Sequence, residues 1–337
     1  MKFIYITDPH ISAKGPSSRT DNYLDTCIAK LGEVAGYAQA NHIPYIILGG
    51  DMFDSPSQNY TTLLRVMNLL AGYDLVTWYI NVGNHDLFGW NPDTYQRTAL
   101  RFLEYLPNVR VLKDRTLFEF PRSSCTPSHI YLYPIWSKYE REGDVSALNV
   151  EFPSQSKRYI IVLPHTMLVE KSFVSAHVSI EQIDWERTGD MILGSHYHPG
   201  YETQIINRTA NGVLDQRIVM NPGSLLRTSK SSEQHVPSFL VIEIDGSTFG
   251  VKSRKIPLAC ALPDPFKEDA PIIPENEALS TPRFEEFMRE LANVTFDIDD
   301  TDPRTVAAKI AHEGKFSKEV LQRVIKNLDM AMAKKGA

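Results

Sequence analysis

The chain has 337 residues, of which 42% are hydrophobic and 23% charged, a globular composition that excludes fibrous repeats and long disordered chains. Its 41 acidic and 35 basic residues give a net charge of −6, which argues against coating of nucleic acid through bulk positive charge but leaves room for a local basic groove. Three widely spaced cysteines argue against a disulfide framework. Without a signal peptide or an apolar run of ~18 residues, the sequence predicts a cytoplasmic protein that does not enter a membrane.

Strands and helices alternate in the first part of the chain. Three short apolar runs, at residues 3–6, 45–48 and 76–82, each end in polar residues and predict buried strands. Between them, residues 23–38 and 63–70 carry apolar side chains on one helical face. This alternation predicts βαβ units and a sheet that is mainly parallel at its start. Such sheets bind ligands beyond the carboxyl ends of their strands, where these polar residues fall.

After these units the sequence predicts one more helix and then mainly strands. The helix is expected over residues 93–106, since Tyr95, Ala99 and Phe102 share a face. The later strands are expected at 109–112, 117–120, 130–133, 158–163, 190–193 and 217–220, followed by a hairpin of 239–244 and 249–256. Asn221-Pro222-Gly223-Ser224 is interpreted as a structural turn.

Composition divides the chain into three parts. Residues 262–282 contain five of the 21 prolines and predict a semi-stiff linker. Residues 283–337 contain three helical patterns and predict a small helical module. The catalytic domain is therefore expected within residues 1–261.

The polar residues at the predicted strand ends form a set of possible metal ligands. They are Asp8, His10, Asp51, Asn84, His85, His165, His196 and His198. All offer oxygen or imidazole donors without a thiolate, a set that suits manganese, iron or zinc rather than a calcium site built only from oxygen. Asp-x-His and His-x-His each place two side chains on the same side of an extended segment.

Each of these patterns alone has a structural interpretation, since Asp and Gly are ordinary turn residues and a single histidine often only ends a strand. Their joint occurrence, each at a strand terminus, favours a two-metal site in which Asp51 bridges ions ~3.5–4 Å apart. His177 is a rival to His165, which directly ends an apolar run and is preferred.

Five motifs carry a resemblance to a known family. They are Asp8-Pro9-His10, Gly50-Asp51-Met52-Phe53-Asp54, Gly83-Asn84-His85-Asp86, His165 and Gly194-Ser195-His196-Tyr197-His198. Together they resemble the motifs of the calcineurin-like metallophosphoesterases over roughly residues 1–256. The Gly-Asp-x-Phe-Asp form, the histidine pair and the helical tail are most similar to the SbcD family of DNA double-strand-break repair nucleases, which includes phage-encoded nuclease subunits.

The resemblance implies an α/β fold, a four-layer α/β/β/α sandwich followed by the helical module. It assigns Asp8, His10 and His198 to one metal and Asn84, His165 and His196 to the other, with Asp51 as the bridge. His85 would face the scissile phosphate as the catalytic residue. Asp86 would orient His85 or cap its turn. Asp54 lies on the substrate side, where some relatives have a histidine.

The resemblance also implies a function. It predicts a metal-dependent DNA exonuclease and endonuclease that hydrolyses phosphodiesters with a hydroxide activated by two metals, in repair, recombination or replication. The two divalent ions are expected to be Mn²⁺, with Mg²⁺, Fe²⁺ or Zn²⁺ as alternatives. The expected partners are DNA, a coiled-coil SMC-like ATPase of the SbcC type that docks on the C-terminal helices, and a second copy of the chain. The protein would act in the cytoplasm, or in the host cytoplasm if a phage encodes it.

Two other functions remain open on sequence. One is a calcineurin-like phosphodiesterase that acts on a small nucleotide-type substrate; the other is a non-catalytic scaffold for the ATPase. Six basic residues lie in segments that could contact phosphate, although solvated surface charge is the commoner role: Lys14, Arg19, Arg97, Arg101, Arg227 and Lys230. The aromatic residues Trp78, Tyr79, Trp136 and Trp185 are interpreted as packing residues rather than platforms for base stacking.

Overall fold

The computed structural model describes residues 1–121, 129–138, 142–152, 158–170, 177–210, 213–261 and 265–268. The predicted helical module at 283–337 and most of the predicted linker at 262–282 lie outside the described residues. Among the helices of the described part, none is long and apolar enough to cross a membrane.

The first of two six-stranded sheets contains the chain's first four strands. Its order is β14-β13-β1-β2-β3-β4, formed by Val251–Pro257, Ser238–Ile244, Lys2–Ile6, Tyr45–Leu48, Thr77–Ile80 and Val109–Val111. Strands β1 to β4 are parallel, and the hairpin of β13 and β14 adds antiparallel strands beside β1. The predicted parallel start of the sheet and the hairpin are therefore confirmed.

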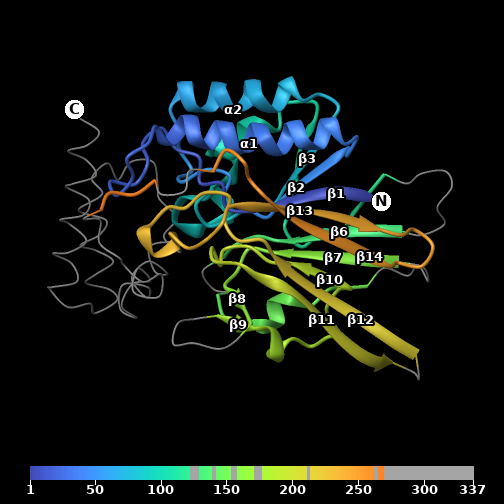
Figure 1. Cartoon of the computed structure of the whole chain (residues 1–337). Coiled ribbons are helices and arrows are strands. Elements are labelled where there is room, and N and C mark those ends of the chain that lie inside the picture. The colour runs from blue at the N-terminus through green and yellow to red at the C-terminus, as the bar shows by residue number, and fades with distance from the viewer. Residues whose placement is uncertain are drawn as a thin grey trace, which may run out of the picture. The chain divides into compact units, whose positions relative to one another are not determined.

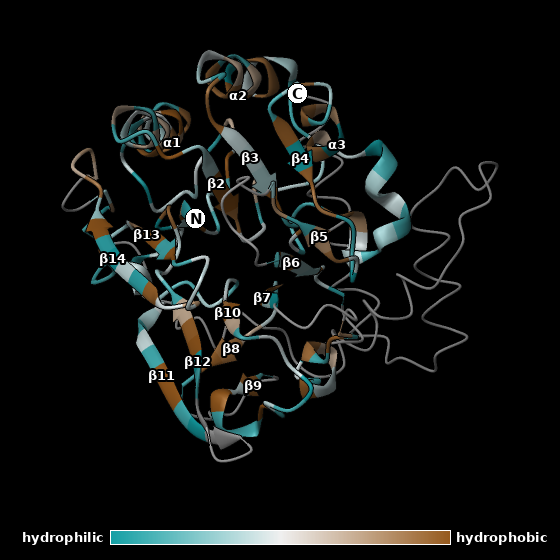
Figure 2. Cartoon of the chain, turned by 90° about the vertical axis from the view of Figure 1, so that its right-hand side faces the viewer, coloured by the Kyte–Doolittle hydropathy of each residue, from teal (hydrophilic) through white to brown (hydrophobic). Residues whose placement is uncertain are grey.

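Two helices cover one face of this sheet, as the sequence predicts. Helix α1 (Tyr23–Ala40) and helix α2 (Tyr60–Gly72) lie side by side above β2 and β3 (Figures 1 and 2). Each begins at an asparagine whose side-chain oxygen accepts a backbone N–H of the first turn: Asn22 caps α1 and Asn59 caps α2. Their apolar faces and the upper face of the sheet form one continuous core.

The second sheet follows in the chain and is also mixed. Its order is β11-β12-β10-β7-β6-β5, formed by Tyr201–Ala210, Val213–Asn221, Met191–Leu193, Arg158–Pro164, His129–Ile135 and Phe118–Glu119. Strands β6, β7, β10 and β12 are parallel to one another, and β5 and β11 are antiparallel edge strands. The second sheet thus also directs several strand ends to one side.

The two sheets pack face to face through a second hydrophobic core, to which Phe3, Tyr5 and Ile47 of the first sheet and Leu132 and Ile161 of the second contribute. A third cluster covers the outer face of the second sheet. In the described residues this outer layer consists of two short 3-10 helices, Val145–Leu148 and Ile180–Gln182, and the small pair β8 (Leu168–Val169) and β9 (Val178–Ser179). The described residues therefore form the predicted α/β sandwich of two sheets, with α-helices outside the first sheet and short elements outside the second.

One sequence prediction about an element was wrong, and one long strand was not predicted. The helix expected over 93–106 is instead a 3-10 helix at Pro92–Arg97 and a short helix α3 at Ala99–Leu103. Thr98 separates them because its backbone is extended and its hydroxyl caps the N–H of Arg101. Strand β11 was not predicted, because it is an edge strand that mixes polar residues with only a few apolar ones and so lacks a continuous apolar run.

Candidate metal centre

The eight predicted ligand and catalytic residues lie together at the carboxyl ends of strands from both sheets. Asp8 and His10 follow β1, Asp51 follows β2, and Asn84 and His85 follow β3 in the first sheet. The second sheet contributes His165 after β7, and His196 and His198 after β10. Backbone bonds from Asp8 N to Gly50 O (3.2 Å) and from His10 N to Asp51 O (3.0 Å) join the first two loops.

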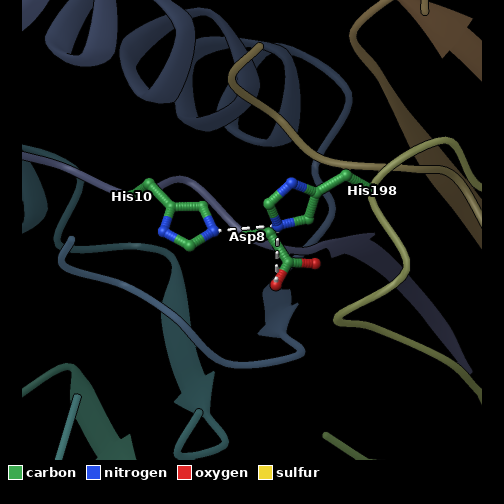
Figure 3. A group of neighbouring side chains, drawn as sticks. All are labelled: Asp8, His10 and His198. Atoms are coloured by element: carbon green, nitrogen blue, oxygen red, sulfur yellow. Dashed lines mark hydrogen bonds and ion pairs between the residues drawn. The ribbon is translucent and has the colours of Figure 1, made fainter. Parts of the chain in front are cut away.

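Asp8, His10 and His198 form the first group of possible ligands (Figure 3). The Nε2 atoms of His10 and His198 lie 3.0 Å apart, although 188 residues separate them in sequence. Asp8 Oδ1 lies 4.0 Å from His198 Nε2. This is the set that the sequence predicts for one metal.

Asp51, His165 and His196 form a second group, with Asn84 beside it. His165 Nε2 lies 3.2 Å from Asp51 Oδ2 and 3.0 Å from Asn84 Oδ1. Asp51 Oδ2 is also 3.6 Å from His10 Nε2, so this one oxygen adjoins both groups. Asp51 Oδ2 therefore lies between the two groups, and its role as a bridge between two metals stays a prediction.

The donor atoms fit divalent cations. Asp51 Oδ2 is buried beside His165 Nε2 and His10 Nε2, but accepts no hydrogen bond of good geometry within the described residues. A buried carboxylate oxygen in this position is costly unless a metal ion or a protonated imidazole compensates its charge. A mixture of carboxylate, amide and imidazole donors suits Mn²⁺, Fe²⁺ or Zn²⁺. The residues could therefore hold two ions, while the assignment of each ligand remains a prediction.

The backbone at the ligands is strained. Four of these residues have left-handed φ angles: Asp8 at 51°, His10 at 42°, Asp51 at 52° and His196 at 67°. Each such residue costs on the order of 1 kcal/mol or more, and strain of this kind is concentrated at functional sites. Because all four lie in the cluster, the strain supports a functional rather than a structural role for these loops.

Hydrogen bonds to His165 leave one ring nitrogen available to the site. Its Nδ1 lies 3.1 Å from the carbonyl oxygen of Gly49, a contact in which Nδ1–H donates. Nε2, which points toward Asp51 and Asn84, then carries the lone pair that a metal needs. Ser195, in the loop after β10, donates its hydroxyl to Pro164 O at 2.8 Å and so ties that loop to the end of β7.

Asp86 caps the turn of its own loop and also links that loop to the loop of Asp51, so its contacts are compatible with both roles predicted for it. Its buried carboxylate accepts backbone N–H groups from Gly83 (3.0 Å), Phe53 (3.2 Å) and Met52 (3.4 Å). Burial, together with the charge of nearby Asp51, raises the pKa of Asp86 to about 7. Gly83 must be a glycine because a Cβ there would lie 2.1 Å from Asp51 Oδ1.

Sequence reasoning missed Asn81, which joins the two sheets beneath the site. Its side-chain amide donates to the carbonyl oxygens of Leu163 (2.8 Å), Ile135 (3.3 Å) and Gly49 (3.4 Å). The signal was present in the sequence, because a polar residue inside the apolar run 76–82 must find buried partners. Asn81 therefore fixes the distance between loops of the two sheets.

Sequence reasoning also missed Lys30, a buried lysine on α1. Its ammonium donates to Leu225 O at 2.9 Å, and Leu225 N donates to Thr7 O at 2.9 Å, so α1 supports the loop next to Asp8. Burial, with the charges of Arg19 and Arg227 nearby, lowers the pKa of Lys30 to about 7.

Two of the six basic residues that could contact phosphate, Arg19 and Arg227, are buried and form hydrogen bonds within the protein instead. Arg19 and Arg227 are only 7% and 4% exposed. Arg19 is paired with Asp21 at 2.8 Å, and Arg227 donates to Glu233 O at 3.1 Å. The predicted turn at 221–224 is structural as expected, since Ser224 N donates to His198 O at 2.9 Å.

The buried carboxylates control the charge of two ligand histidines. Burial lowers the pKa of His10, but Asp54, Asp51 and Asp8 outweigh it and raise the value to about 9. Burial likewise opposes protonation of His165, and Asp51 raises its pKa to about 10. The pKa of His196 is instead lowered to about 3 by burial and by the positive charge of His165.

These pKa values predict how metal affinity depends on pH. With pKa values near 9 and 10, His10 and His165 are protonated at pH 7 in the metal-free protein, whereas a metal binds neutral imidazole. Binding of Mn²⁺ at pH 7 should therefore release about two protons, and affinity should rise with pH toward 9. Calorimetry in buffers of different ionisation enthalpy measures this release; binding without proton release would contradict the prediction.

A sandwich of two mixed sheets with Asp, Asn and His ligands at the meeting strand ends defines a metallophosphoesterase-type dimetal hydrolase. The sequence model of the calcineurin-like phosphoesterases matches residues 1–200, more than half of the chain. The chain belongs to the calcineurin-like phosphoesterase family, and the predicted superfamily is confirmed.

Two solved structures are similar to this chain at low sequence identity. No curated protein matches the chain. A solved structure of TT1561 from Thermus thermophilus has 11% identity and a TM-score of 0.41, covering 75% of this chain and 97% of that one. A dimetal phosphatase from Danio rerio has 11% identity and a TM-score of 0.47, with 76% and 96% covered.

Proposed function

We propose that this protein is a DNA nuclease of the SbcD type that hydrolyses phosphodiester bonds at the two-metal site. The observation that carries the proposal is the position of His85 at the open side of the buried ligands. The His85 and Asp54 side chains are 42% and 45% exposed, whereas Asp51 is buried. A phosphodiester within a long polymer can reach a site that opens at the surface in this way.

His85 has the contacts expected of a group that acts on substrate. Its Nδ1 lies 2.9 Å from the backbone oxygen of Asp54, a contact in which Nδ1–H donates and Nε2 is left for the substrate. Its backbone N–H donates to Asp51 Oδ1 at 2.8 Å, which fixes the loop beside the ligands. The structure also groups His85 with His10 and Asp51 as possible ligands, and its exposure favours the substrate-facing role.

The residues of the site would have separate roles in metal binding, in positioning and in the reaction at the phosphate. Two divalent cations would supply Lewis-acid activation of water and neutralise phosphate charge when bound. Asp51 and the ligand histidines would hold the cations, and Asp86 keeps the loops of Asp51 and His85 together. His85 stabilises charge on the phosphate or gives a proton to the leaving oxygen. The carboxylate of Asp54 lies 3.5 Å from His10 Nδ1, and its backbone oxygen accepts a hydrogen bond from His85 Nδ1. Asp54 therefore orients the imidazoles of His10 and His85 in addition to any contact with the phosphate.

The form of the motifs supports DNA over a small substrate. The Gly50-Asp51-Met52-Phe53-Asp54 and His196-Tyr197-His198 sequences resemble those of the SbcD family. A phosphodiesterase acting on a small nucleotide-type substrate would share the metal ligands and needs no DNA-binding surface. It is therefore the main alternative.

A comparison of substrates in the presence of Mn²⁺ distinguishes the nuclease from the small-substrate phosphodiesterase. The substrates are linear duplex DNA, single-stranded DNA, bis(p-nitrophenyl) phosphate and cyclic nucleotides. The nuclease should shorten DNA from its ends and cut single strands. Intact DNA alongside turnover of the small diesters would overturn the nuclease proposal in favour of the alternative. A protein that binds DNA but neither metal nor any diester would be the non-catalytic scaffold.

We further propose Mn²⁺ as the preferred ion, a second copy of the chain as partner, and a coiled-coil ATPase that binds residues 283–337. The preference for Mn²⁺ is tested by the activity of metal-free protein reloaded with Mn²⁺, Mg²⁺, Fe²⁺ or Zn²⁺. Association with a second copy of the chain is tested by measuring the molecular mass in solution. A chain ending at residue 282 should no longer co-purify with the co-expressed ATPase, and unchanged co-purification would contradict docking on these residues.

A further inference from the structure

An aromatic side chain that the sequence analysis did not single out stands beside the metal ligands. Trp90 lies six residues after Asn84, in the 3-10 helix Phe88–Trp90, and is half-buried. Its ring centroid is 6.4 Å from that of His196, and the two ring planes are nearly perpendicular at 83°. The indole is therefore a direct neighbour of the second ligand group.

The backbone around Trp90 is held in an unfavourable conformation. Gly89 and Trp90 have consecutive left-handed φ angles of 56° and 58°. A bulky residue rarely adopts this conformation, which costs free energy and is concentrated at functional sites. Hydrogen bonds from Phe88 N to Thr94 Oγ1 (3.1 Å) and from Asn91 N to Phe88 O (3.1 Å) hold the turn. The backbone from which the indole projects is thus held in place by its loop.

The same loop also carries an exposed ring and a cation. Phe88 is 38% exposed, and the guanidinium carbon of Arg97 lies 5.5 Å from its ring centroid. Proteins that bind single-stranded nucleic acid use aromatic rings to stack on the bases and arginine side chains to pair with the phosphates. Arg97 is one of the cations for which the sequence left a phosphate contact open.

We propose that Trp90 stacks on the nucleobase attached to the phosphate at the metal site and so selects nucleotide substrates over other phosphodiesters. The proposal rests on the proposed nuclease function, whose substrate it specifies. Stacking tolerates every base, because each has a flat face, and so suits an enzyme without base preference. It assigns Trp90 a role in substrate binding, separate from the chemistry at His85.

Two esters with the same leaving group test this role without using DNA. Thymidine 5′-(p-nitrophenyl phosphate) carries a base, and methyl p-nitrophenyl phosphate does not. Trp90→Ala should lower the ratio of kcat/KM for the first ester to that for the second by roughly 5- to 150-fold, mainly through KM. Trp90→Phe should retain most of the ratio, because a smaller ring still stacks.

Control variants and outcomes separate stacking from a structural effect. Tyr105→Ala removes a 73% exposed ring that contacts Phe102 and should leave the ratio unchanged. An equal loss on both esters in Trp90→Ala, or an unchanged ratio, would overturn the proposal. Intact DNA with a lowered ester ratio would overturn the nuclease function and leave stacking supported. If the wild-type protein turns over neither ester, the test becomes binding of the Mn²⁺-loaded protein to oligothymidylate and to an abasic oligonucleotide of the same length. If Trp90 stacks on a base, Trp90→Ala should weaken binding of oligothymidylate and leave binding of the abasic oligonucleotide unchanged. Equal effects on both oligonucleotides would overturn the proposal.

Discussion

Replacing His85 with alanine should lower kcat for phosphodiester hydrolysis by about 10²- to 10⁴-fold, the usual contribution of a general acid or base. Two bound metal ions should remain, because His85 lies at the exposed side of the cluster while the predicted ligands are more enclosed. Turnover on DNA with metal analysis of the same preparations measures both quantities. Loss of a metal ion in the variant would show that His85 is a ligand.

The leaving group separates the two roles that His85 could have. If His85 protonates the leaving oxygen, the loss on DNA should exceed the loss on bis(p-nitrophenyl) phosphate, because p-nitrophenolate leaves without a proton. Equal losses would instead assign His85 to stabilisation of charge on the phosphate. His42→Ala is a matched control, since His42 is an exposed histidine whose removal should leave both rates unchanged.

Replacing Asp51 with asparagine should remove metal binding and activity together. Asp51 Oδ2 adjoins both ligand groups, at 3.2 Å from His165 Nε2 and 3.6 Å from His10 Nε2. Loss of a residue that only supports a ligand costs about 10- to 100-fold in affinity, and loss of a carboxylate shared by two ions should cost more. Titration of the metal-free protein with Mn²⁺ should show weak binding at both sites.

Asp54→Asn provides a control for charge alone. This variant also removes a carboxylate beside His10, but Asp54 is half-exposed and belongs to neither group of predicted ligands. It should keep two ions and lose activity only in part, through looser placement of His10 and His85. Full metal binding by Asp51→Asn would contradict the bridging role, whatever its activity.

The sequence predicted the class of fold and the composition of the site because both depend on local patterns. Short apolar runs that end in Asp8, Asp51 and Asn84 identify strands and the polar residues that terminate them. In a parallel sheet those ends lie on one edge, so proximity within the first sheet follows from the chain order. The same reasoning failed for residues 93–106, where capping by Thr98 overrides helical periodicity.

Only the tertiary structure decided the contacts between residues far apart in the chain. Without the family resemblance, the residue patterns do not specify that His10 and His198 meet. Neither the patterns nor the resemblance specify that Asn81 joins both sheets or that Trp90 stands beside His196. The sequence placed Arg19 and Arg227 among possible phosphate contacts, whereas folding buries them. The physical reason is that periodicity reports which face of an element is apolar, while the packing of two sheets determines what that face meets.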